Sequence, residues 1–162
     1  MFNRLLEALW FVHRQGLVHG AVLPNNLLVD IRQHGLLLCE YAYAVPIGIP
    51  PIALSGSHAT WYPPEIPARA PATHASDIFM ATRCLIYILG GDPLSGELPP
   101  TVPPPIQRFI RGCLLPTPSR RPTDVGALRE EFDDCLAGLY GKRAFRPFAM
   151  PADAEPAFGS AP

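Results

Sequence analysis

Charged side chains are scarce in this sequence. Thirteen basic and fourteen acidic residues make up 17% of its 162 positions and leave a formal net charge of −1. Nucleic-acid binding needs clustered cations that neutralise phosphates, and the sequence contains no basic block. We therefore expect no nucleic-acid partner. Hydrophobic residues at 48% predict a folded chain rather than a disordered one.

Long uninterrupted apolar runs are also missing. The most apolar window, residues 36–54, contains Glu40 and three prolines, so it cannot cross a bilayer as a helix. We expect no signal peptide before the first predicted helix. The four cysteines are widely and irregularly spaced, which favours free thiols in a reducing compartment over a disulfide framework or a zinc site. We expect a cytoplasmic protein without membrane contact.

Proline is abundant instead, with 21 residues, and this predicts short elements and many loops. The length suits one domain with a hydrophobic core. From residue 141 the composition changes to proline, alanine and scattered aromatics. We expect a domain over residues 1–140 and a Pro/Ala-rich C-terminal tail over residues 141–162.

Apolar spacing predicts a helix over residues 2–15, ended by a glycine. A short extended step follows at residues 17–19. Two apolar runs, residues 27–29 and 36–39, flank a turn at 31–35 and predict a small hairpin.

From residue 41 to 71 the periodicity disappears, and connections of that length usually carry function or are disordered. A helix apolar on almost every face is then predicted over residues 76–90, with Ser76 or Asp77 as its cap. Such a helix belongs in the middle of the domain.

Two more helices are predicted, one from residue 105 or 106 to 115 and an amphipathic one capped by Thr123 or Asp124. The expected fold class is mainly α with a small β-hairpin.

Five stretches suggest a more specific interpretation. They are FVHRQGLVH at 11–19, the loop 19–26, SHATWYPPE at 57–65, SDIF at 76–79 and CLLPTPSRRPT at 113–123. In this order they resemble the C-terminal lobe of eukaryotic-type protein kinases, over about residues 3–139. By this resemblance, residues 19–26 correspond to the catalytic loop, and residues 57–65 resemble the end of the activation segment.

Within the loop, His19 matches the His of the family's H-R-D motif, Pro24 its lysine-proline step and Asn26 its metal-binding Asn. The catalytic Asp position is Ala21, however, and the catalytic Lys position is Leu23. The resemblance thus implies a degenerate, pseudokinase-like C-lobe.

Other kinase parts are replaced or missing. Residues 40–42, Glu-Tyr-Ala, stand where the family has D-F-G, and nothing resembles its Gly-rich loop or its V-A-I-K strand. We therefore expect the chain to lack the N-lobe. Phosphoryl transfer relies on metal ions, a Lys on the phosphates and a carboxylate that orients the nucleophile. We expect no enzymatic activity and no cofactor.

An alternative is that the chain is a fragment or split part of a Ser/Thr protein kinase, an ATP-dependent phosphotransferase whose N-lobe is supplied elsewhere. Mg-ATP would then be the cofactor. Asn26 and Glu40 offer oxygen ligands for Mg²⁺, and Leu28 takes a position that faces adenine in the family. We favour a simpler interpretation, in which Asn26 bonds its own loop backbone and Glu40 is solvated or paired with an arginine.

The resemblance also assigns structural roles. Glu65 is expected to pair with Arg121, either as a surface pair worth under about 1 kcal/mol or as a buried pair whose disruption costs about 3 to 5 kcal/mol. Asp77 is expected to accept backbone N–H groups of the loop. His19, Tyr41 and Asp77 are expected to align as the lower part of a kinase's internal spine.

The remaining histidines predict no metal site. His13 and His19 do not share helical ligand spacing, and His34, His58 and His74 fall in predicted loops.

The favoured function is a non-catalytic protein-interaction or scaffold module. Without an N-lobe, the apolar surface of the first helix, the hairpin and Leu28 would be uncovered, and such patches usually mark interfaces. We expect a homodimer or a protein partner on the surface that an N-lobe would cover, with the tail from Pro147 as a further candidate cover. A helical adaptor of another fold would lack the hairpin or the buried helix.

Overall fold

The structure is a computed structural model that describes residues 1–30 and 35–141. It is mainly helical with small antiparallel sheets, as the sequence predicts. Most of the expected turn at 31–35 and all of the expected tail beyond Gly141 lie outside the described residues. Both the hairpin and the buried helix are present.

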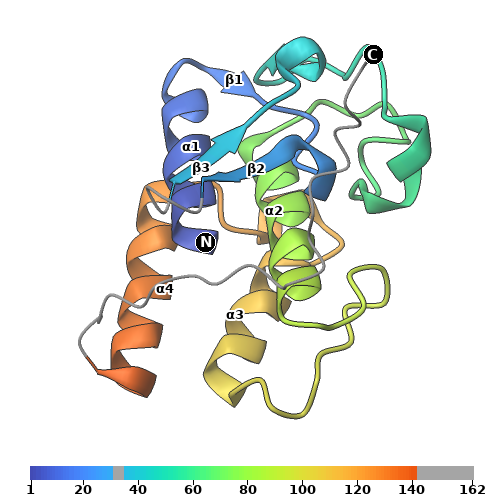
Figure 1. The fold of residues 1–162 in the computed structure, drawn as a ribbon. Coiled ribbons are helices and arrows are strands. Elements are labelled where there is room, and N and C mark those ends of the chain that lie inside the picture. Colours follow the sequence, from blue (N-terminus) through green and yellow to red (C-terminus); the bar gives the residue numbers. More distant parts are fainter. Residues whose placement is uncertain (31–34, 142–162) are drawn as a thin grey trace, which may run out of the picture.

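Helix α2 passes through the centre of the molecule, with α1 and α4 to one side and α3 at its lower end (Figure 1). Helices α1 and α3 pack on α2, and α4 contacts both α1 and α3. The helices are α1 (Phe2–Arg14), α2 (His74–Ile88), α3 (Pro104–Cys113) and α4 (Val125–Tyr140). None of the described helices is both long enough and apolar enough to cross a lipid bilayer.

Three phenylalanines join α1, α3 and α4. The Phe2 ring meets Phe132 edge-on with centroids 5.0 Å apart, and Phe109 lies 5.0 Å from Phe132. Edge-to-face contacts of this kind add about 0.5–1.5 kcal/mol to the area they bury. The apolar faces of these three helices therefore meet in one part of the core. Helix α4 is capped by Asp124, whose Oδ1 accepts the Ala127 N–H at 3.1 Å.

The predicted start of the central helix is wrong by two residues. Helix α2 begins at His74, and Thr73 takes the N-cap position in an extended conformation. Ser76 is not the cap, because its hydroxyl accepts the Thr73 N–H at 3.3 Å and donates to Glu65 at 3.0 Å. Asp77 lies one residue further into the helix, and its carboxylate accepts hydrogen bonds from the loop at residues 19–20 instead of capping α2.

The predicted hairpin pairs β2 (Leu27–Asp30) with β3 (Gly35–Leu38), and Leu28 lies opposite Leu37. A second small sheet, which the sequence did not predict, pairs β1 (Leu17–Val18) with β4 (Val45–Pro46). A two-residue strand is too short for a periodic signal. The rest of residues 41–71 is irregular apart from two 3₁₀ turns, Tyr41–Tyr43 and Gly56–Trp61.

Candidate functional site

The carboxylate of Asp77 anchors the loop that the sequence singles out. Asp77 is fully buried in the first turn of α2. Its Oδ2 accepts the His19 N–H at 2.7 Å, and its Oδ1 accepts the Gly20 N–H at 2.9 Å. The Nε2 atom of His13, at the end of α1, lies 2.9 Å from the same Oδ2. One carboxylate therefore joins α1, α2 and the loop.

Gly20 explains how the loop comes so close to its neighbours. Its φ is +74°, a left-handed conformation, and a Cβ at this position would lie 2.7 Å from the Tyr43 carbonyl oxygen. Any larger residue would therefore require the backbone to move.

The middle of the loop faces the interior. Ala21 and Leu23 are both fully buried. The Asn26 side chain is buried too, and its Nδ2 donates to the Ala21 carbonyl at 2.9 Å. Asn26 thus ties the loop to its own backbone, as in the favoured interpretation.

His19 is fully buried, and its Nδ1 accepts the Ala21 N–H at 3.2 Å. Its ring meets Tyr41 at nearly a right angle, with centroids 4.8 Å apart. Burial lowers the pKa of His19, while the nearby Asp77 carboxylate opposes that shift. The neutral ring is favoured at pH 7. His19 thus touches both Tyr41 and Asp77, the expected spine neighbours, although Tyr41 is half exposed.

Asn26, Leu28 and Glu40 line one cavity of about 310 Å³, so the structure brings all three candidate ligand residues together. Glu40 is exposed. Among the described residues, no group of three or more His, Cys, Asp or Glu side chains could hold a metal ion. Asn26 and Glu40 leave most positions of an octahedral Mg²⁺ to water or phosphate, so these residues do not fit a protein-held ion.

Glu65 and Arg121 form a buried pair, with side chains 6% and 0% exposed. Arg121 Nη1 donates to Glu65 Oε1 at 2.6 Å, and Nη2 donates to Oε2 at 3.0 Å. The other three N–H groups of the guanidinium reach the carbonyls of Leu115, Pro116 and Ala75. All five donors of Arg121 are therefore used, which a lysine could not reproduce.

Sequence reasoning missed two contacts of α2. Arg83 lies over the Phe79 ring at 4.7 Å and donates to the Thr60 carbonyl, so it ties the irregular segment to the helix. His74 was predicted to lie in a loop, which is wrong. It begins α2, and its ring stacks on His13. Neither the Arg83–Thr60 contact nor the His13–His74 contact has a local sequence signal, because the two partners of each come from distant parts of the chain.

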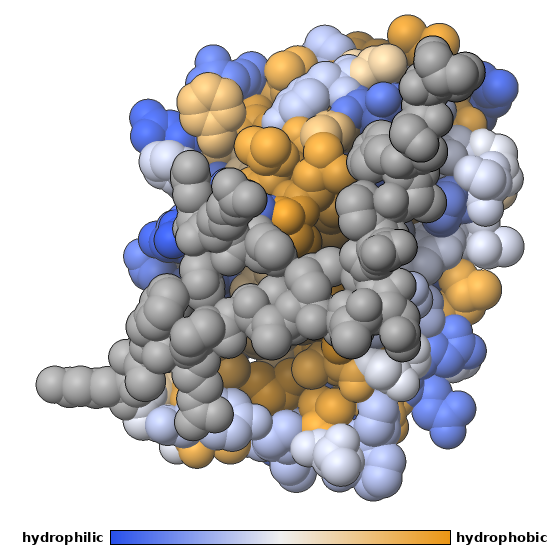
Figure 2. Space-filling view, in the orientation of Figure 1, coloured by the Kyte–Doolittle hydropathy of each residue, from blue (hydrophilic) through white to orange (hydrophobic). Residues whose placement is uncertain are grey.

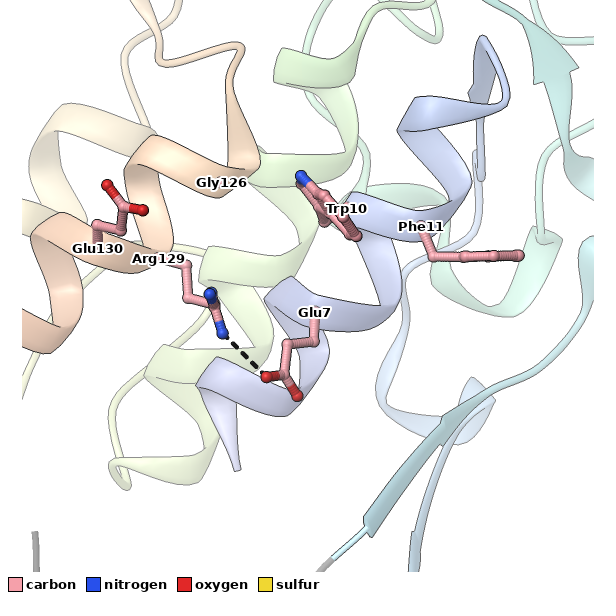
Figure 3. A pocket seen from close by; sticks show the side chains of 6 residues that line it. All are labelled: Glu7, Trp10, Phe11, Gly126, Arg129 and Glu130. Atoms are coloured by element: carbon pink, nitrogen blue, oxygen red, sulfur yellow. Dashed lines mark hydrogen bonds and ion pairs between the residues drawn. The ribbon is translucent and has the colours of Figure 1, made fainter.

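A further cavity of about 460 Å³ lies between α1 and α4 (Figure 3). Trp10 lies beside Gly126, whose lack of a side chain leaves room for the indole. Phe11 extends away from α4 and is exposed. The Glu7–Arg129 pair at 2.9 Å is partly exposed and is worth under about 1 kcal/mol.

Comparison with known proteins agrees with the sequence resemblance. The chain is 30% identical to protein kinase gsk3 of Schizosaccharomyces pombe over 93 residues, which cover 56% of this chain and 24% of that protein. It is 25% identical to the serine/threonine-protein kinase PknA of Mycobacterium tuberculosis over an alignment of 172 positions, which covers 93% of this chain and 39% of that protein. PknA of Mycobacterium bovis matches equally well.

These similarities indicate a protein kinase-like relationship for this chain. No protein-family profile matches the chain. The chain spans between about a quarter and two fifths of the length of these kinase relatives.

Replacing Glu65 tests the buried pair of this kinase-like chain. Glu65→Ala leaves the Arg121 guanidinium buried without its carboxylate, and we expect the free energy of unfolding to fall by about 3–5 kcal/mol. Urea denaturation followed by circular dichroism measures this loss. Glu131→Ala, on the exposed side of α4, is the control and should change stability by less than about 0.5 kcal/mol. Equal midpoints for both variants would contradict the prediction.

Replacing Asp77 tests the loop anchor. Asp77→Asn keeps the size of the side chain but offers only one acceptor oxygen, so a charge-assisted hydrogen bond worth about 1.5–3 kcal/mol is lost. We expect the His19 and Gly20 amides to exchange faster with deuterium. Asp134→Asn, on the exposed face of α4, should leave both amides protected. Unchanged protection in Asp77→Asn would show that the carboxylate does not hold the loop.

Proposed function

We propose that this chain is a non-catalytic, pseudokinase-like protein-interaction module. The observation that supports it best is the burial of Ala21 and Leu23, which occupy the positions of the catalytic Asp and Lys. A methyl group cannot orient a substrate hydroxyl or accept its proton. An isobutyl group in the core cannot stabilise charge on a phosphate. Neither side chain reaches the surface where a substrate would bind.

The residues that hold the loop in shape are retained. Asp77 accepts the loop amides, Asn26 closes the loop on Ala21, and the Glu65–Arg121 pair joins the irregular segment to the late helices. All of these groups act on the chain itself. This combination favours a scaffold that has kept a kinase-like shape without its chemistry.

The β2–β3 hairpin supports an interaction role. Leu28 and Leu37 lie opposite each other and are 54% and 63% exposed. Leu27 and Leu36 pack against the core instead, so the hairpin is apolar on both faces. Apolar side chains gather over this hairpin in Figure 2. A solvated antiparallel hairpin normally shows polar residues on its outer face, so a second copy or another protein is the proposed cover.

A kinase fragment is the alternative. In that case another polypeptide or another part of the gene product supplies the upper lobe, and the cavity with Asn26, Leu28 and Glu40 takes Mg-ATP. The short span of the chain within its kinase relatives favours this alternative. For either function, the free cysteines favour a reducing, cytoplasmic location.

Nucleotide binding separates the two proposals. We expect Mg-ATP at about 5 mM to leave the melting temperature unchanged. A ligand that binds only the folded state must raise the melting temperature, so an unchanged value would indicate that Mg-ATP does not bind. Differential scanning fluorimetry measures the shift, with Mg²⁺ alone as the control. A rise of several degrees that depends on ATP would favour the fragment.

A charged substitution tests whether the exposed face of the β2–β3 hairpin is an interface. Leu37→Glu places a carboxylate on the proposed interface without disturbing the core, since this side chain is exposed. We expect light scattering to show the wild type as a dimer or a complex and Leu37→Glu as a monomer of unchanged stability. Leu94→Glu is the matched control on an exposed leucine elsewhere and should keep the wild-type assembly. A wild-type monomer without a co-purifying protein would contradict the interface.

A further inference from the structure

Two histidines stack face to face between α1 and α2. The ring centroids of His13 and His74 lie 3.9 Å apart and their planes differ by 6°. His13 is only 8% exposed. Within the described part of the chain, neither His13 Nδ1 nor His74 Nε2 has a hydrogen-bond partner, and both atoms are inaccessible to water. The planes of parallel rings at this spacing do not converge, so the two imidazoles cannot share one metal ion.

This stack is connected to the His19 loop. His13 contacts His74 through its ring face and Asp77 through Nε2, 2.9 Å from Oδ2. The same carboxylate accepts the amides of His19 and Gly20. His74 is therefore connected to the loop through His13 and Asp77.

A proton on His74 would be unfavourable in this arrangement. It would place a charge in a partly desolvated position against a second imidazole, and the buried Nε2 would carry an N–H without an acceptor. Burial lowers the pKa of His74 and the neighbouring His13 lowers it further, while Asp77 and a hydrogen bond to the Thr123 backbone oppose the shift.

The charged groups around the stack have other partners. On α1, the Arg14 guanidinium lies over the Trp10 ring at 4.8 Å. At the start of α4, Asp124 caps its own helix. Arg14, Asp124 and both stacked histidines line one open cavity of about 780 Å³. His19 approaches from the loop, and Asp77 already receives three hydrogen-bonding groups. The cavity gives a charged His74 a route to water.

We propose that the His13–His74 stack is a pH-sensitive latch: below about pH 6.5 protonation turns His74 into the adjoining cavity and weakens the hold of Asp77 on the His19 loop. The latch depends on these contacts alone and not on the proposed function.

The direction of the effect follows from proton binding. The pKa of His74 is lower in the folded chain than its ordinary value of 6.5. The unfolded chain therefore binds more protons as the pH falls through that value. The stability that comes from a neutral His74 is complete above about pH 6.5 and is lost below it.

The first test compares melting temperatures at pH 7.5 and pH 5.5. His74→Phe keeps an aromatic ring on His13 but cannot be protonated. We expect it to lose less on acidification than the wild type, by about 2–4 °C. His58→Phe removes a histidine from the irregular segment and should lose as much as the wild type. Equal losses in the wild type and His74→Phe would overturn the latch.

The second test needs no variant. In the wild type we expect the His74 imidazole to titrate below pH 6.5 by NMR, and the His19 and Gly20 amides to lose protection over the same range, after correction for intrinsic exchange. A midpoint at or above 6.5 would overturn the proposal. So would amide protection that stays constant while His74 titrates.

Discussion

The carboxylate of Asp77 is the constraint on which the rest of the structure depends. A fully buried charge is tolerated only where hydrogen-bond donors surround it, and this one has the His19 and Gly20 amides and the His13 ring. Those donors come from a helix end and from the loop after it. The carboxylate therefore fixes how the end of α1 and the loop meet α2.

The residue before it serves a second buried ionic centre. Ser76 donates to Glu65, which holds Arg121 through two parallel hydrogen bonds. Adjacent positions in one helical turn thus connect the His19 loop on one side and the late helices on the other. Buried ionic groups of this kind are costly to break and favour one arrangement of the chain. They support the proposal that the chain keeps a kinase-like shape without the chemistry, since Ala21 and Leu23 stand at the positions that the resemblance assigns to the catalytic Asp and Lys.

Two further features do not follow from these buried ionic contacts. The β2–β3 hairpin is apolar on both faces, although only one face packs on the core. The stack of His13 on His74 places two titratable rings beside the anchor of the loop. The hairpin is the proposed place for a partner, and the stack is the proposed way for acid to weaken the loop. Both involve α1 or the segments next to it.

The sequence by itself indicated the helices and the hairpin, because periodicity is local. It also placed Ala21 and Leu23 at the positions that the kinase resemblance assigns to catalytic groups, which needs no structure. It also indicated the Glu65–Arg121 pair through a resemblance, but left its burial open. Only the tertiary structure decided that burial, the N-cap at Thr73, the β1–β4 pairing and the position of His74 on His13. The burial, the β1–β4 pairing and the His13–His74 contact depend on residues far apart in the chain, whose proximity is created by folding and leaves no periodic signal.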